Sequence, residues 1–310
     1  MKTVKKQIIK TGISLLTFGV CSSLHAQQNP VYTQYIYNPT IINPAYAASK
    51  ESMSFFGLYR NQWVGIDGAP KTANVGFTTP LNNPKLGLGI NFVNDHIGAL
   101  DENSISFDLA YTLDLDAQYK LALGLKGTAN LLSMSYSKLN IYDQTMPFAY
   151  EDVKNKFSPN IGAGAYLYSD EAYLGLSVPK IFKVDYYDDI KRRTMRQQPL
   201  FYLMGGYVFD LGSDWLLKPA FLSKIGSGKP SVDLTANFLF QEKFTIGTAY
   251  RWNAGISALT GFQIDENWFL GYAYDFDTTK LNQYNAGTHE IFMRFDWMGS
   301  FKSKRKSRFF

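Results

Sequence analysis

A repeating alternation of side chains constrains this chain more than any other feature. From Met53 to Trp297, runs of eight to twelve residues alternate apolar with polar or small side chains, and the gaps between them alternate short with long. Successive side chains of a strand point to opposite faces, and in a transmembrane β-barrel one face contacts lipid and the other the lumen. Charges within such runs then face inward, as we expect for Asp108, Arg251, Asp275 and Arg294. The pattern predicts an all-β, antiparallel transmembrane barrel.

The alternation divides the chain into about fourteen candidate strands. A charge on the lipid face near mid-membrane costs about 2–4 kcal/mol for Lys or Arg, so we expect the polar face of each strand to line the lumen. Segments 71–79 and 214–223 are less clearly patterned, and Pro219 removes a ladder donor from the second. The predicted strands are 53–60, 71–79, 85–94, 103–113, 119–136, 158–169, 171–178, 199–210, 214–223, 229–240, 242–252, 254–265, 267–276 and 287–297.

The gaps between these segments orient the barrel. Short gaps interleave with longer ones, the longer set being 61–70, 95–102, 137–157, 179–198 and 277–286. Turns are short on the periplasmic side of such barrels and loops are long outside, so the longer set is predicted to lie outside. Glycines occupy many predicted inward positions, which indicates either a narrow lumen or something packed closely against its wall: Gly87, Gly89, Gly124, Gly162, Gly164, Gly205 and Gly271.

Composition and the termini limit the class of protein. Residues 1–26 have a basic start, an apolar stretch and a small residue at Ala26, which predicts a cleaved signal peptide. Beyond them no apolar run approaches the length of a membrane helix, and no cysteine remains. Four of the 31 Lys and Arg lie in this leader, leaving 27 against 26 acidic residues, so no nucleic-acid partner is expected. Residues 53–298 form the predicted barrel and 299–310 a basic tail.

Residues 27–52 are not strand-like. Three Asn-Pro pairs occur here, and each proline fixes its own backbone and holds its predecessor extended. Asn43-Pro44 also matches a helix cap followed by proline at the first helical position, so one helical turn over 45–48 is expected. Two interpretations remain open: the segment plugs the lumen or docks a periplasmic partner, or it is a passive strap that aids barrel assembly.

Two segments resemble a known family. The first is QNPVYTQYIYNP at 28–39, continued by NPAYA at 43–47, and the second is YRNQWVGIDGAP at 59–70. Both are similar to motifs of the PorP/SprF family of Bacteroidetes outer-membrane proteins, which belong to the type IX secretion system. Ala48 stands where that family usually has glycine. The motifs span about 40 residues, and the rest of the chain is similar in pattern and length.

The resemblance implies a role and a location. It implies an outer-membrane component that assists export or surface attachment of cargo proteins, such as gliding adhesins, through their type IX C-terminal signal domain. The implied partners are that cargo, other components of the secretion system and membrane lipid. Loops 137–157 and 179–198 are where we expect cargo specificity, because loops tolerate variation that a hydrogen-bonded wall does not.

The two motif segments supply the candidate partner-binding residues. In 59–70 they are Arg60, Gln62, Trp63 and Asp67, where Arg60 and Asp67 are candidates for pairing or for binding a partner. The alternative is a structural latch that closes the first hairpin and seats Trp63 at the membrane interface. In 27–52 the candidates are Tyr32, Tyr35 and Tyr37.

Catalytic, cofactor and metal sites are not predicted. Beyond the leader only His96 and His289 remain, and neither has a serine or paired carboxylate beside it that sequence would single out. No cysteine pair or His spacing indicates a metal site. We therefore expect a non-enzymatic protein without a cofactor. The rival hypothesis is an outer-membrane channel or transporter for small molecules, since fourteen strands can enclose a ligand-sized lumen.

Overall fold

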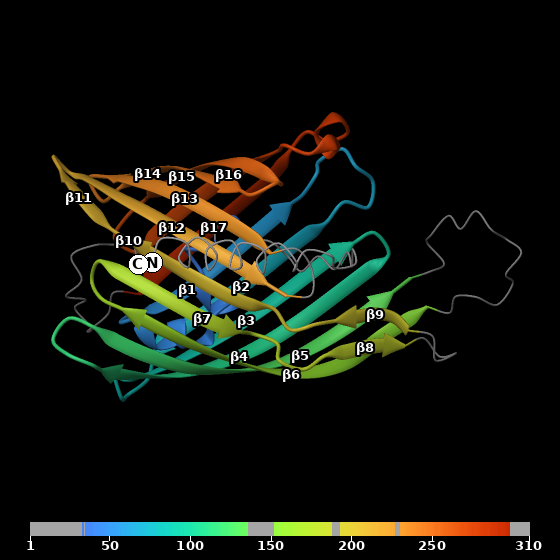
Figure 1. Ribbon diagram of the computed structural model, residues 1–310, viewed down its shortest axis with the longest axis horizontal. Helices are drawn as coiled ribbons and strands as arrows, with labels where there is room; N and C mark the ends of the chain where they lie inside the picture. The colour runs from blue at the N-terminus through green and yellow to red at the C-terminus, as the bar shows by residue number, and fades with distance from the viewer. Residues whose placement is uncertain (1–32, 34, 136–151, 188–192, 227–229, 298–310) are drawn as a thin grey trace, which may run out of the picture.

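The barrel predicted from the alternation is present. The structure, a computed structural model, describes residues 33, 35–135, 152–187, 193–226 and 230–297 (Figure 1). Every strand of the barrel pairs antiparallel with both neighbours, and the first strand pairs with the last from Met53 opposite Trp297 to Asn61 opposite His289. β10 and β11 are two parts of one barrel strand, because both pair with β12. The wall therefore has fourteen strands, as predicted.

The bounds of the strands fall close to those expected from the sequence, except that β6 begins at Val153, within the predicted loop 137–157. They are β1 Met53–Asn61, β2 Lys71–Pro80, β3 Leu86–Ile97, β4 Leu100–Asp114, β5 Lys120–Met134, β6 Val153–Tyr168, β7 Ala172–Val178, β10 Phe201–Tyr207 with β11 Phe209–Gly212, β12 Trp215–Ile225, β13 Ser231–Phe240, β14 Phe244–Arg251, β15 Gly255–Gln263, β16 Trp268–Asp277 and β17 Thr288–Trp297.

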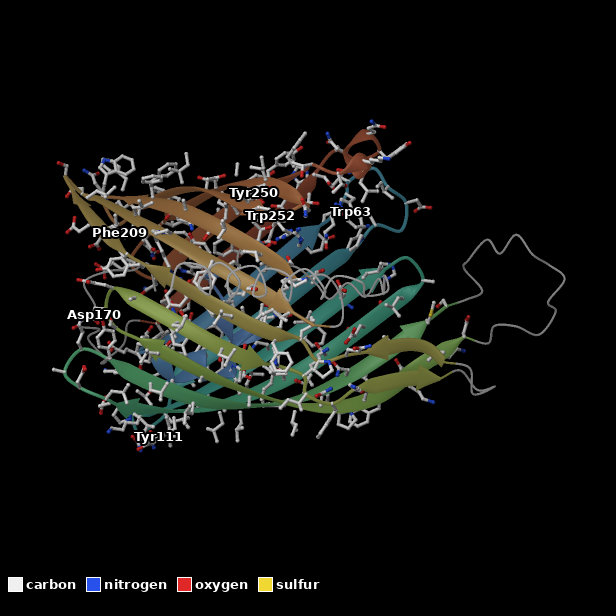
Figure 2. All side chains as sticks on the ribbon, viewed as in Figure 1. Trp63, Tyr111, Asp170, Phe209, Tyr250 and Trp252 are labelled. Carbon is white, nitrogen blue, oxygen red and sulfur yellow. The ribbon has the colours of Figure 1, made fainter. Side chains whose placement is uncertain are left out.

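The two faces of the wall differ as the alternation predicts. In β4 the odd-numbered positions from Ile105 to Leu113 are exposed on the outside, and the even-numbered positions between them are buried. Figure 2 shows Tyr111, Phe209 and Tyr250 on the outer surface. An exposed apolar face on every side of a closed sheet is what a lipid environment stabilises. None of the helices in the described part of the chain is long and apolar enough to cross a membrane.

The barrel has two different ends. At one end, here called the short-turn end, β2–β3, β4–β5 and β6–β7 are joined by short connections, and at the other, the long-loop end, the connections are mostly longer. Figure 2 labels Asp170 at the short-turn end and Trp63 at the long-loop end. The connection 179–200 carries a hairpin of its own, β8 Val184–Tyr187 paired with β9 Arg193–Gln197. The last long loop contains a 3-10 helix, Lys280–Gln283.

One predicted long loop is wrong. Residues 95–102 are not a loop: β3 and β4 continue to Ile97 and from Leu100, and only Gly98 and Ala99 separate them. Cross-strand contacts among polar side chains support this extension, since the Asn94 amide donates to both Asp101 and Asn103. The extension carries no apolar side to contrast with a polar one, so the alternation does not reveal it.

The segment before β1 lies inside the barrel. Residues 33 and 35–50, here called the lumenal segment, start at Thr33 beside the long-loop end of β1 and finish at Lys50 near Asp296, at the short-turn end. They include two 3-10 helices, η1 Pro39–Ile41 and η2 Pro44–Ser49. The predicted helical turn is confirmed, with the Asn43 side chain accepting a hydrogen bond from the Ala45 amide. The leader, Tyr32, most of loop 137–157 and the basic tail lie outside the described residues.

Glycines in the wall make room for this segment. A Cβ added at Gly87 would lie 2.1 Å from the Ala47 carbonyl oxygen, and one at Gly124 would lie 2.3 Å from the Ala45 nitrogen. The sequence left two explanations for the inward glycines, a narrow lumen or a segment packed closely against the wall. At Gly87 and Gly124 the second is correct, because the lumenal segment packs against them. Every residue of η2 is buried, and its side chains join Tyr35, Ile36 and inward aromatic residues of the wall in one core cluster.

Candidate functional site in the barrel lumen

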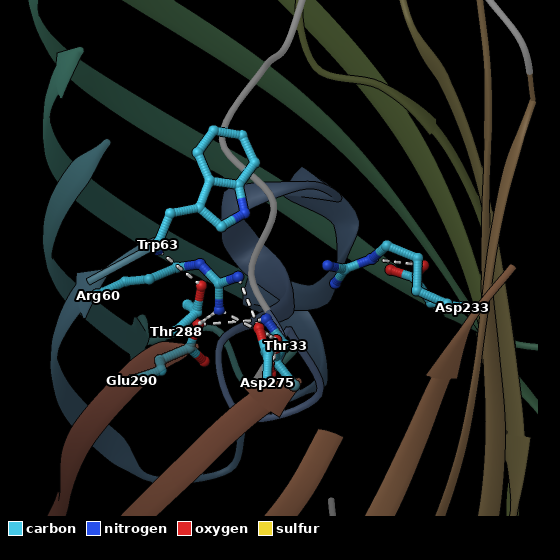
Figure 3. Close-up of polar contacts among 8 residues, drawn as sticks. Thr33, Arg60, Trp63, Asp233, Asp275, Thr288 and Glu290 are labelled. Atoms are coloured by element: carbon cyan, nitrogen blue, oxygen red, sulfur yellow. Dashed lines mark hydrogen bonds and ion pairs between the residues drawn. The ribbon is translucent and has the colours of Figure 1, made fainter. Parts of the chain in front are cut away.

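An ion cluster holds the start of the lumenal segment. Arg60 of β1 is 2% exposed, and its Nη2 lies 2.7 Å from an Asp275 carboxylate oxygen and its Nη1 2.8 Å from one of Glu290. β17 lies between β1 and β16 in the sheet, with Arg60 directly opposite Glu290. Thr33 completes the cluster: its amide donates to Glu290 and its hydroxyl to Asp275 (Figure 3). Charge-assisted hydrogen bonds of this kind are the stronger ones in proteins.

A second polar layer lies around η1. The Asn38 amide donates to Asn91 of β3 at 3.1 Å, and Asn91 in turn donates to Asp108 of β4. Lys126 of β5 forms an ion pair with Asp108 at 2.7 Å and donates to the Thr40 carbonyl at 3.0 Å. A buried charge is stable only when it is paired and hydrogen-bonded, and this layer satisfies both conditions while fastening the segment to three strands.

A third layer fixes the segment before η2. The Asn43 side chain donates to the Ala165 carbonyl of β6 at 3.0 Å and accepts from the Ala45 amide at 3.0 Å. The adjacent Ile42 carbonyl accepts a hydrogen bond from Ser177 of β7 at 2.7 Å. A Cβ at Gly164 would lie 2.1 Å from the Asn43 side chain, so the wall is shaped to this asparagine.

Replacing this asparagine tests the third layer. We expect Asn43→Ala to lower the unfolding free energy by about 1–3 kcal/mol, because the change removes the helix cap and the hydrogen bond that Asn43 donates to the half-buried Ala165 carbonyl. Thermal unfolding of the purified barrel in detergent, followed by circular dichroism, measures the loss. Asn83→Ala is the matched control, since Asn83 caps an exposed turn. Equal losses for the two variants would contradict the assignment.

The rim loop, residues 62–70, closes over the seam between β1 and β17. The Val64 amide donates to the Gly287 carbonyl at 2.9 Å, and the Ala286 amide donates back to Val64 at 2.7 Å. The Trp63 amide donates to the Thr288 hydroxyl. Trp63 itself has a φ of 46°, in the left-handed region, which these contacts hold in place. These contacts fasten the rim loop to the end of the last long loop, as a structural latch would, while the seating of Trp63 at the membrane interface stays a prediction.

The structure places the predicted partner-binding residues in two groups, one in the interior of the barrel and one at its rim. Arg60, Tyr35 and Tyr37 face the interior: Tyr35 is 3% exposed, and the Tyr37 ring lies 4.6 Å from that of Phe292. Such buried rings cannot meet a periplasmic partner while the segment stays in place. The pairing of Arg60 with Asp67 is wrong, since Arg60 binds Asp275 and Glu290 instead and Asp67 is exposed on the rim loop.

Gln62 and Trp63 are half-buried at the rim. Gln62 donates its backbone amide to the Pro70 carbonyl at the base of the rim loop. A cleft of about 480 Å³ lies under the loop, lined also by Lys71 and His96. Of the second motif, these residues and Asp67 therefore remain within reach of a partner.

Sequence reasoning missed the partners of the inward charges. The alternation marks Asp275 and Glu290 as inward, but no local signal connects them to Arg60, which lies 215 and 230 residues earlier in the chain. Only strand order brings the three together. Among the described residues, no group of three or more His, Cys, Asp or Glu lies close enough to hold a metal ion.

The family model of the type IX secretion system membrane protein PorP/SprF matches residues 24–295. The chain belongs to the PorP/SprF family. The match covers the lumenal segment and nearly the whole wall, so both are parts of the PorP/SprF architecture, and it places this barrel in the outer membrane as a component of that secretion system. No curated protein matches the chain.

Solved structures show the same kind of wall. The chain is similar to the CymD monoaromatic hydrocarbon channel, with a TM-score of 0.50 and 11% identity over 88% of this chain and 95% of that one. It is also similar to a Pseudomonas aeruginosa FadL homologue, with a TM-score of 0.43 and 12% identity over 86% and 95%. At such identities the likeness concerns the PorP/SprF fold alone, an outer-membrane barrel.

Proposed function

We propose that this PorP/SprF barrel assists export or surface attachment of cargo proteins, such as gliding adhesins, by binding their type IX C-terminal signal domain at the long-loop end. In this proposal the protein is not an enzyme and needs no cofactor. The long-loop end faces the cell exterior, and the short-turn end faces the periplasm, where other components of the secretion system would dock.

The observation that carries this proposal is the fastened lumenal segment. Three layers of buried contacts, at Thr33, Asn38–Thr40 and Asn43, tie it to strands on several sides of the wall. A barrel that binds its own chain in the lumen offers its surfaces, rather than its interior, to a protein-sized partner. The hairpin β8–β9 and the rim loop are the structured surfaces available at that end.

The rival is a channel for small molecules, and one observation favours it: the likeness of the wall to the CymD channel. That likeness concerns the wall, whereas the lumenal segment occupies the space that a solute would cross. Conductance in planar bilayers separates the two hypotheses. We expect the wild-type barrel to show no steady open pore, and a robust solute-selective pore would favour the rival.

Affinity capture from detergent-solubilised envelopes of exporting cells tests the secretion role directly. We expect the wild-type protein to co-purify with a secreted polypeptide that ends in a type IX signal domain. Replacing residues 184–197, which contain β8 and β9, by a short Gly-Ser linker should reduce the recovery at least about tenfold if this hairpin carries cargo recognition. Replacing the exposed turn 115–119 at the opposite end by a similar linker is the control and should leave recovery unchanged. Recovery of no secreted polypeptide with the wild type would contradict the proposal.

A further inference from the structure

A cavity of about 110 Å³ lies between the lumenal segment and the wall, on the side of η1 that faces the long-loop end. Ile41 and Ile42 form its floor, and Leu200 and Tyr202 of the β10 side add further apolar surface. The charged lining consists of Asp95 of β3, Glu102 of β4 and two lysines, Lys126 and Lys180. The two lysines form ion pairs with Asp108 and Glu102, so the cavity combines mainly apolar walls with charged groups among which Asp95 has no cationic partner in the described part of the chain.

Asp95 differs from the other buried carboxylates of the lumen. Asp95 is 6% exposed. Its one hydrogen bond within the described part of the chain comes from the Thr72 hydroxyl at 2.6 Å. Its neighbour across the strands, Glu102, forms an ion pair with Lys180 at 3.1 Å. Within the same described part, the other buried carboxylates of the lumen, Asp108, Asp233 and Glu290, each have a Lys or Arg within 4.0 Å, and so do the half-buried Asp275 and Asp296.

A carboxylate without a cationic partner, beside an apolar cavity, favours a ligand that carries both a positive charge and an apolar part. A buried charge is costly unless it is paired, so a cation that enters the cavity stabilises Asp95. The side chain that combines an apolar stem with a compact cationic head is lysine. The volume equals that of about four water molecules, which suits one such side chain and is too small for a folded element.

We propose that this cavity binds a lysine side chain of the exported polypeptide, with the ammonium group on Asp95 and the stem against Ile41, Ile42 and Leu200. The inference deepens the proposed function and rests on it. The occupant is a polypeptide rather than a free amine because the cavity lies at the end of the barrel where the cargo-facing loops are, and a lysine on a docked chain is presented there at high effective concentration.

The charge selectivity of the cavity can be measured without knowing the cargo. Beyond the predicted leader the chain has no cysteine, so Ser104→Cys places one thiol in the lining. We compare its reaction rate in purified protein with aminoethyl methanethiosulfonate, a cation, and with sulfonatoethyl methanethiosulfonate, an anion. We expect the cation to react about tenfold faster, since Asp95 is the lining carboxylate whose charge no nearby Lys or Arg offsets, and an unbalanced local charge concentrates the opposite ion by such factors.

Two variants decide whether Asp95 causes the preference. Adding Asp95→Asn should bring the ratio of the two rates close to one. Adding Asp101→Asn, which removes a half-exposed carboxylate on the same hairpin outside the lining, should leave the ratio unchanged. A ratio near one with Asp95 present, or a ratio that Asp95→Asn does not change, would overturn the proposal.

Photo-cross-linking identifies the occupant in exporting cells. A benzoylphenylalanine at Gln198, in the cavity lining, should cross-link to a secreted polypeptide next to a lysine, and one at the exposed Lys183 serves as the control position. Cross-linking from Lys183 but not from Gln198 would overturn the cavity proposal and leave the proposed function standing. Cross-linking from neither position would contradict both. A cross-link from Gln198 to this chain's own Lys138 would also overturn the cavity proposal, because the occupant would then be an outer loop of the same barrel.

Discussion

Arg60→Leu is expected to lower the unfolding free energy of the barrel by about 3–5 kcal/mol, because it removes the cation that forms ion pairs with both Asp275 and Glu290 in the lumen. The same change removes the hydrogen bond that Arg60 donates to the Thr33 hydroxyl, and so weakens the hold on the start of the lumenal segment. The temperature at which the folded band disappears in semi-native gel electrophoresis measures the loss of stability.

Two further variants test whether the loss of stability comes from the ion cluster at Arg60 or from the removal of any cation. Lys85→Met breaks an ion pair with Asp114 on an exposed turn, where solvent screens the interaction, and should change the transition little. Combining Arg60→Leu with Asp275→Asn and Glu290→Gln removes the opposing charges together and should restore much of the lost stability. If the triple variant is no more stable than Arg60→Leu alone, unpaired charge is not the cause.

Gly87→Val is expected to displace the lumenal segment and open the pore. The first carbon of any side chain at this position would lie 2.1 Å from the Ala47 carbonyl oxygen, and that backbone atom can move only with η2. Overpacking of a filled core costs about 1–3 kcal/mol or more, which is enough to shift the balance between a bound and a displaced segment. Planar-bilayer recordings should show a conductance that the wild type lacks.

Gly127→Val is the matched control for this experiment. Gly127 lies on the exposed face of β5, with no atom within 4 Å of an added Cβ, so the same substitution there should neither conduct nor destabilise. A closed barrel for both variants, with equal thermal stability, would show that the segment does not depend on the glycine at position 87.

The alternation predicts the wall because the two faces of each strand meet different solvents. Side chains at the odd positions of β4 are exposed and those at the even positions are buried, so the inward direction of Asp108 follows from its place in the sequence alone. The extension of β3 and β4 to Ile97 and Leu100 does not follow, because these are its only two apolar residues and they form no alternating pattern; side-chain hydrogen bonds from Asn94 support it.

The candidate site is predictable only in part. The Asn-Pro pairs indicate a fixed path for residues 27–52, and the cap at Asn43 is local enough to be recognised. The path itself depends on wall residues far away in sequence, such as Asp275 for Thr33 and Ala165 for Asn43. Arg60 shows the same limit: its nearest acid in sequence, Asp67, is not its partner, because register across β1 and β17 decides which acid it meets.

The lumenal segment runs lengthwise through the barrel and is joined to β1 at the short-turn end, next to Lys50. A periplasmic machine that pulled on that junction would load the three sets of contacts in series, so that Asn43 yields first and Thr33 last. The force needed for withdrawal would then be set by the strongest single set rather than by all of them together. A lumenal segment that is stable in the resting barrel would therefore leave the lumen in steps, under a force no larger than the strongest single set of contacts resists.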